Sequence, residues 1–117
     1  MKLNFDQKKL AELCEKYGIA YLGLFGSFAR AEATSNSGVD LLVEFSETKS
    51  LFERARVLLG FQEFFGRPVD LVTKSTLKPN REPYIRKDLV SLYGKNNYLR
   101  KLLSEILTEN SAKESNS

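Results

Sequence analysis

Two apolar runs, joined by a polar stretch that begins with Gly-Ser, constrain this chain more than any other feature. The first run, IAYLGLF, covers residues 19–25, and the second, VDLLVEF, covers residues 39–45. Both have the length and composition of buried β-strands. A strand followed by a Gly-Ser turn and a short helix can bind phosphate, because glycine lets backbone N–H groups approach the oxygens closely. We therefore predict that Gly26 and Ser27 hold a phosphate group, with a short helix over residues 28–32.

Acidic residues occur early in the second of these runs and in a later one. Asp40 is the second residue of VDLLVEF, and Asp70 lies in PVDLV, a short apolar run that predicts a third strand. Side chains alternate along a strand, so Asp40 shares a face with Leu42 and Glu44, and position 38 lies on that same face. Mg²⁺ prefers carboxylate and phosphate oxygens. The pattern predicts a metal site at Asp40 and Asp70, where an unpaired buried carboxylate would be costly.

These linked motifs resemble the polymerase-β-like nucleotidyltransferase fold. More narrowly, GSFARAE followed by VDLLVEF and RPVDLV is similar to the minimal nucleotidyltransferases, the small antitoxins that are paired with HEPN-domain toxins. The resemblance covers roughly residues 5–107, nearly the whole chain. It departs from the pattern at Gly38, which stands where the family has the first acid of an acid-x-acid pair, and mildly at Ala31, where glycine is more usual.

The resemblance implies an α/β (α+β) fold with a small mixed sheet of about three strands and packed helices. It also implies transfer of AMP from ATP to a tyrosine hydroxyl of a HEPN toxin, which silences the toxin. On this interpretation Gly26 and Ser27 hold the triphosphate, while Asp40 and Asp70 bind Mg²⁺ and Asp70 can instead take the proton of the attacking hydroxyl. With Gly38 in place of a metal ligand, we expect poor transfer or none.

Three alternatives remain open from the sequence. The chain could block its toxin by contact alone, which Gly38 favours and the retained Ser27, Asp40 and Asp70 oppose. Gly38 could also be an introduced or recent change in an otherwise working enzyme. Transfer of AMP to a small molecule such as an aminoglycoside is the third, although the chain offers no added domain to bind such an acceptor. Arg30 has two interpretations as well, a phosphate contact or an ion pair that holds the turn.

One helix is predicted before the strand pair and another after it. Asp6 can cap a helix with Leu10, Leu13, Cys14 and Tyr17 on one face, and Gly18 ends it. Cys14 is interpreted as a core residue rather than a nucleophile. Ser50 and Glu53 have capping-box spacing and begin a helix that runs to about residue 65. Its apolar stripe is predicted to be core and comprises Leu51, Phe52, Ala55, Leu58, Leu59 and Phe65.

The C-terminal third is predicted to be a loop and two helices. Residues 78–83 read as loop, and Ile85, Leu89 and Leu92 have the spacing of a helix. A last helix over Leu99 to Leu107 carries an apolar stripe that either completes the core or, with Tyr93 and Tyr98, contacts the toxin. The domain is therefore expected to span residues 1–107, with a disordered polar tail over 108–117.

Composition narrows the classes of function. The chain has 117 residues, enough for one domain, and no histidine, which excludes a histidine base and argues against a zinc site. No run approaches the roughly 18 to 20 apolar residues of a membrane span, so we expect a cytoplasmic protein without a membrane partner. The net charge of +3 is mild and dispersed, so direct nucleic-acid binding is not expected. The expected partners are ATP and a HEPN-domain toxin, in a hetero-oligomer.

Overall fold

The two predicted strands lie next to each other at the centre of a four-stranded sheet. A computed structural model describes residues 1–73 and 76–94. In chain order its elements are α1 (Gln7–Lys16), β1 (Ile19–Phe25), β2 (Val39–Phe45), α2 (Leu51–Phe65), β3 (Val69–Thr73), α3 (Glu82–Asp88) and β4 (Val90–Tyr93). The strand order is β3-β2-β1-β4, with β2 and β3 parallel and the other pairs antiparallel. This confirms the predicted α/β class and mixed sheet, although the sheet has four strands rather than about three.

The sheet register brings the predicted site residues to one edge. The last residue of β1, Phe25, pairs with Asp40, and Asp40 is in turn the register partner of Asp70 in β3. Since β1 runs against β2 and β3, the C-terminal end of β1 meets the N-terminal ends of the other two strands. The Gly26 turn and both acids therefore lie together.

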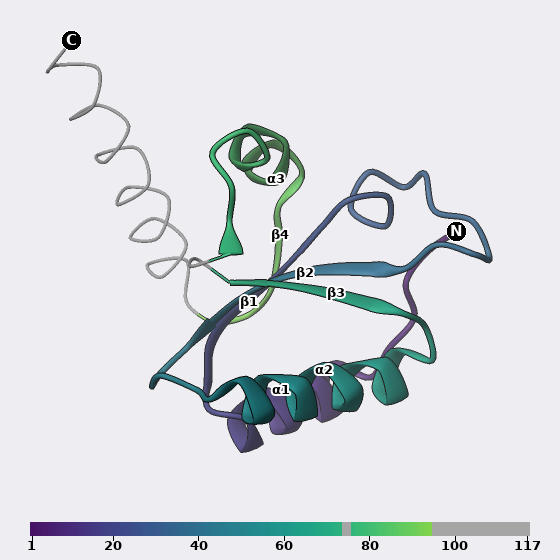
Figure 1. The fold of residues 1–117 in the computed structure, drawn as a ribbon. Coiled ribbons are helices and arrows are strands. Elements are labelled where there is room, and N and C mark those ends of the chain that lie inside the picture. The colour runs from purple at the N-terminus through teal and green to yellow at the C-terminus, as the bar shows by residue number, and fades with distance from the viewer. Residues whose placement is uncertain (74–75, 95–117) are drawn as a thin grey trace, which may run out of the picture.

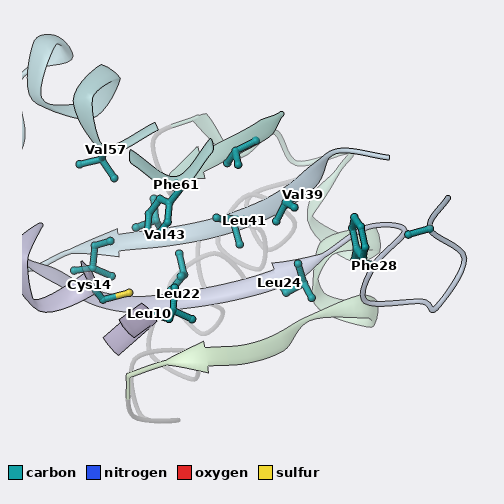
Figure 2. Close-up of a cluster of buried hydrophobic side chains, with 13 residues drawn as sticks. Leu10, Cys14, Leu22, Leu24, Phe28, Val39, Leu41, Val43, Val57 and Phe61 are labelled. Carbon is teal, nitrogen blue, oxygen red and sulfur yellow. The ribbon is translucent and has the colours of Figure 1, made fainter. Parts of the chain in front are cut away.

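The helices divide between the two faces of the sheet. Figure 1 shows α1 and α2 together on one face and α3 on the other. The face under α1 and α2 carries the larger hydrophobic cluster, shown in Figure 2. It contains Leu10, Cys14, Ile19, Leu22, Leu24, Phe28, Ala33, Val39, Leu41, Val43, Val57, Phe61 and Val69. The face toward α3 has a cluster of only four buried residues, namely Phe25, Leu42, Val72 and Ile85. The predicted alternation along β2 is confirmed.

Helix α1 begins and packs as its sequence predicts. The Oδ1 atom of Asp6 accepts hydrogen bonds from the backbone N–H groups of Lys8 and Lys9, at 2.9 and 3.1 Å. Leu10 and Cys14 are completely buried. Burial raises the pKa of the Cys14 thiol to about 12, so the thiol stays protonated at neutral pH. Its interpretation as a core residue is confirmed.

Helix α2 has the predicted bounds, but its buried face differs from the predicted stripe. The Ser50–Glu53 capping box is formed, and Gly66 ends the helix in the left-handed region. Leu51, Phe52 and Leu59 are 78%, 74% and 62% exposed, whereas the buried residues are Val57 and Phe61. The predicted stripe is confirmed at Leu58 and Phe65, which pack against the larger cluster, and wrong at Leu51, Phe52 and Leu59. Its six apolar positions spread around more than one side of this helix. The arc centred on Val57 and Phe61, one turn apart, is the one that faces the sheet.

The fourth strand replaces part of a predicted helix. Helix α3 begins at Glu82, inside the predicted loop, and ends at Asp88, and Leu89 then turns to an extended conformation. The residues of β4 pair with β1, where Ser91 is the register partner of Gly23. The Ser91 hydroxyl also lies 2.9 Å from that of Tyr21. A helix continuing through Leu92 would leave this edge of β1 unpaired, so sheet pairing outweighs the helical spacing.

Some predictions concern residues outside 1–73 and 76–94. The expected last helix, the tail over 108–117, the boundary at residue 107 and the proposed contact at Tyr98 all belong to this group. Within the two described ranges, no helix is both long and apolar enough to span a membrane.

Candidate active site

The turn after β1 is built around a close contact between Gly26 and Asp40. Gly26 has φ +77°, in the left-handed region, and a Cβ atom placed on it would overlap Oδ2 of Asp40. Any other residue would therefore push the Asp40 carboxylate away from the turn. Glycine is required here both for the backbone conformation and for the approach of the carboxylate.

Residues 27–31 form turns rather than the predicted short helix. The Arg30 N–H donates to the Gly26 carbonyl at 3.1 Å, while the Glu32 N–H donates to the Ser27 carbonyl at 2.9 Å. The second bond spans five residues and closes a wider loop than an α-helical turn. Ala31 has φ +60°, a conformation that favours glycine. A left-handed residue at this point interrupts the helix.

Asp40 and Asp70 form a carboxylate pair at the edge of the sheet. Burial raises the pKa of Asp40, and the charge of Asp70 raises it further, while Arg81 and Arg30 act in the opposite direction. Asp70 is less buried than its apolar run suggests, with a side chain that is 55% exposed. Its partner is Arg81, whose guanidinium lies 3.7 Å away. Because ionised Asp40 is disfavoured by burial and by Asp70, the pair favours a bound cation.

Helix α3 forms one wall of a pocket of about 240 Å³ beside this pair. The pocket is lined by Phe25, Gly26, Arg30, Asp40, Arg81, Tyr84, Ile85 and Asp88. Four of these residues have the spacing i, i+3, i+4 and i+7 and so share one face of the α3 segment. Arg30 joins this wall to the turn, because its Nη1 atom lies 2.7 Å from Oδ2 of Asp88 and its Nε atom lies 3.0 Å from Glu32. The ion-pair interpretation of Arg30 is confirmed.

Gly38 precedes β2 by one residue, and nothing in its backbone demands glycine. Its φ is outside the left-handed region, and a Cβ atom would lie 3.1 Å from the Pro68 carbonyl oxygen. That contact is tight, and it needs a shift of a few tenths of an ångström. A side chain at position 38 therefore requires the Pro68 carbonyl, which accepts the Val39 N–H at 2.8 Å, to move by that amount.

The nucleotidyltransferase domain family matches residues 7–93, from α1 to β4. The chain belongs to this family. It is 38% identical over 79 residues to the protein adenylyltransferase MntA of Thermococcus cleftensis, covering 68% of this chain and 80% of MntA. The nucleotidyltransferase resemblance seen in the motifs is thus confirmed.

Solved structures share the fold of this nucleotidyltransferase domain. A crystal structure of a toxin–antitoxin with AMP-PNP superposes with a TM-score of 0.78 at 16% identity, over 96% of this chain and 92% of the other. A structure of a tri-AMPylated Shewanella oneidensis HEPN toxin in complex with MNT antitoxin gives 0.63 at 16% identity, over 93% and 90%. At this identity the likeness concerns the fold.

The two carboxylates of this nucleotidyltransferase domain are enough to bind Mg²⁺ when substrate phosphates and water supply the remaining ligands. Among residues 1–73 and 76–94 there is no group of three acidic, histidine or cysteine side chains that could hold a metal ion. Mg²⁺ is commonly bound by one or two carboxylates together with substrate phosphates and water. Asp40 and Asp70 would hold the ion, which when bound supplies positive charge to the phosphates.

Three residues of the site were missed by sequence reasoning. Arg81 and Tyr84 lie some forty residues after Asp40, and only the position of α3 brings them to the pocket. Arg67 holds the loop before β2, because its Nη1 atom donates to the carbonyls of Ser35 and Ser37 at 2.9 and 3.1 Å. No local pattern marks an arginine for such a role, since its partners are backbone oxygens.

Proposed function

We propose that this chain is an antitoxin-type protein adenylyltransferase, which transfers AMP from ATP to a tyrosine hydroxyl of a HEPN-domain toxin. The observation that carries this proposal is the packing of Asp40 over the Gly26 turn, with Asp70 beside it in the sheet register. A phosphate-binding turn and two carboxylates at one sheet edge suit phosphoryl transfer, in which positioning and charge supply most of the catalysis. The kinship with MntA and the likeness to toxin–antitoxin structures support the choice of acceptor.

Each site residue has a role in this proposal. Gly26 and Ser27 hold the triphosphate through backbone N–H groups and the serine hydroxyl. Asp40 and Asp70 hold Mg²⁺, and the exposed Asp70 can also accept the proton of the incoming hydroxyl. The tyrosine oxygen bonds to the α-phosphorus as the bond to pyrophosphate breaks. Arg81, beside Asp70, adds positive charge where the phosphates enter.

In this proposal, Gly38 lowers the rate of AMP transfer. A carboxylate at position 38 would share the face of Asp40, because side chains two residues apart in a strand point the same way. Losing one electrostatic contact of this kind typically costs about 10²- to 10³-fold in rate. We therefore propose that the chain transfers AMP slowly or not at all.

The proposed partner of this chain is a HEPN-domain toxin, which it binds in a hetero-oligomer in the cytoplasm. The acceptor hydroxyl comes from this partner. Contact through residues 99–107 stays a prediction, since they lie outside the described part of the chain.

A second candidate function is neutralisation of the toxin by binding alone. Gly38 favours it, because an antitoxin that acts by contact does not need the full acid set. The contact between Gly26 and Asp40 opposes it, because a site without a function would be free to lose this restriction. The two candidates make different predictions for a restored acid.

The test compares the chain, Gly38→Asp and Gly38→Asn in the presence of labelled ATP, Mg²⁺ and the product of an adjacent gene. The asparagine variant is the matched control, since it has nearly the same shape without the charge. We expect Gly38→Asp to label the partner about 10²- to 10³-fold faster than the other two. Equal labelling by all three would refute the role of position 38. Neutralisation of the toxin without labelling by any of them would favour the binding function.

A further inference from the structure

The pocket beside the two acids contains a tyrosine hydroxyl of its own. Tyr84 belongs to the α3 wall and is 73% exposed, although it lines the same pocket as Gly26 and Asp40. Of the residues that line this pocket, Tyr84 alone carries a hydroxyl group. An accessible hydroxyl group therefore shares a small space with the groups assigned to nucleotide binding.

The other tyrosines in the described ranges occupy different environments. Tyr21 is completely buried, and its hydroxyl lies 2.9 Å from that of Ser91. Tyr17 packs against Phe61, with ring centroids 5.9 Å apart, on the face under α1 and α2. Tyr93 packs against that same larger cluster. Among the tyrosines of residues 1–73 and 76–94, only Tyr84 combines exposure with a place in the pocket.

The charges around Tyr84 suit an incoming triphosphate. Arg81, one turn before Tyr84, lines the pocket and also reaches Asp70. Arg30 lies on the side of the turn and is fixed there by Asp88. The Arg81 guanidinium can bind phosphate oxygens by directed hydrogen bonds, whereas that of Arg30 is already paired with Asp88 and Glu32. A nucleotide bound at Arg81 would lie beside Tyr84, which lines the same pocket.

We infer that Tyr84 is an acceptor of AMP within its own chain, an inference that rests on the proposed nucleotidyl transfer. Gly38 slows this step in the parent chain, and an acid at position 38 accelerates it. The Tyr84 oxygen bonds to the α-phosphorus of ATP, and the bond between that phosphorus and the pyrophosphate oxygen breaks. Pyrophosphate leaves, and the phenolic proton passes to the Asp70 carboxylate and then to water. The product is a phosphodiester between Tyr84 and adenosine, with no change of oxidation state.

Modification of Tyr84 hinders the binding of a further nucleotide. The attached AMP stays at the wall of the pocket and occupies the space that the next nucleotide needs. A chain modified at Tyr84 therefore binds ATP more weakly than the unmodified chain.

The test incubates Gly38→Asp, the form with restored acid, with ATP and Mg²⁺ and without any partner. Mass spectrometry of the intact chain and of its peptides measures the added AMP. We expect one AMP on the peptide that contains Tyr84, with a rate constant independent of protein concentration. Tyr84→Phe, which keeps the ring and removes the hydroxyl, should abolish this product, whereas Tyr17→Phe should leave it unchanged. AMP on another residue, or a rate that rises with protein concentration, overturns the assignment.

A second measurement does not depend on catalysis. Nitration of Tyr84 by tetranitromethane in the parent chain should be slowed several-fold by a non-hydrolysable ATP analogue, while nitration of Tyr17 should not change. Equal nitration of Tyr84 with and without the analogue contradicts its place beside the nucleotide. If Gly38→Asp labels the toxin but not Tyr84, the inference fails and the proposed function stands. If it labels neither, both fail.

Discussion

One face of the sheet supplies most of the hydrophobic core, and the other carries the candidate active site. The face under α1 and α2 buries a cluster of thirteen hydrophobic residues and has capped helices. The face toward α3 buries four and carries Asp40, the Gly26 turn and the pocket. The first face contributes most of the apolar burial, which is the dominant favourable term in folding.

The face toward α3 also contains features that oppose folding. Ala31 is held in a left-handed conformation, and Asp40 is an acid whose ionised form is disfavoured by burial and by Asp70. Such costs gather at functional sites, where the surrounding structure fixes them in place. Substitutions that remove these costs should therefore raise stability, whereas truncation of a buried apolar side chain should lower it on either face.

The largest effect is expected from Phe61→Ala in the larger cluster. Phe61 is completely buried, and truncation of a buried phenylalanine costs about 3–5 kcal/mol of unfolding free energy. Ile85→Ala, its counterpart behind the pocket, should cost about 2 kcal/mol, because the open pocket lets neighbouring groups move inward. Urea denaturation measures both. A larger loss for Ile85→Ala than for Phe61→Ala would contradict the division between the faces.

A gain in stability is expected from Ala31→Gly. A non-glycine residue in the left-handed region costs about 1–2 kcal/mol, part of which is offset by the greater freedom of glycine in the unfolded chain. We expect a net gain of about 0.5–1 kcal/mol, measured by thermal or urea unfolding. The matched control is Ala55→Gly within α2, where glycine should cost about 1 kcal/mol. Destabilisation by both substitutions would show that Ala31 is not strained.

A smaller gain, which depends on pH, is expected from Asp40→Asn. The folded state raises the pKa of Asp40 above its ordinary value of 3.8, so it binds the proton more tightly than the unfolded chain does. The contribution of Asp40 to stability therefore falls as pH rises from about 3.8 through the raised pKa. Asparagine removes this loss, so the variant should be more stable than the parent at neutral pH, with EDTA present. Unfolding measured across pH values should show that advantage shrinking toward acid; an advantage that is constant with pH excludes titration of Asp40 as its cause.

Local signals predicted the first face better than the second. The caps at Asp6 and Ser50 and the alternation along β2 are written in consecutive residues, and the structure confirms them. The exposed side of α2 was not predictable, because helical spacing alone does not say which of several apolar arcs meets the sheet. Strand β4 was missed since its pairing partner lies about seventy residues away.

The site shows the same limit. Gly26, Asp40 and Asp70 are linked through motifs in or next to strands, and the register does bring the two acids together. Arg81 and Tyr84 belong to a short helix whose position depends on packing around Ile85 rather than on any local pattern. The α3 residues that form the wall of the pocket could therefore not be predicted, whereas the Gly26 turn and the two acids could.

Calorimetric titration of ATP tests most directly whether the face toward α3 is a nucleotide site. The forms to compare are the parent chain, Ser27→Ala and Asp40→Ala, each with and without Mg²⁺, with Tyr17→Phe as a control on the opposite face. We predict weak binding to the parent, weaker binding to Ser27→Ala with or without Mg²⁺, and a smaller effect of Mg²⁺ on Asp40→Ala. Tyr17→Phe should match the parent. Identical affinities in all four forms would contradict a phosphate site at the Gly26 turn.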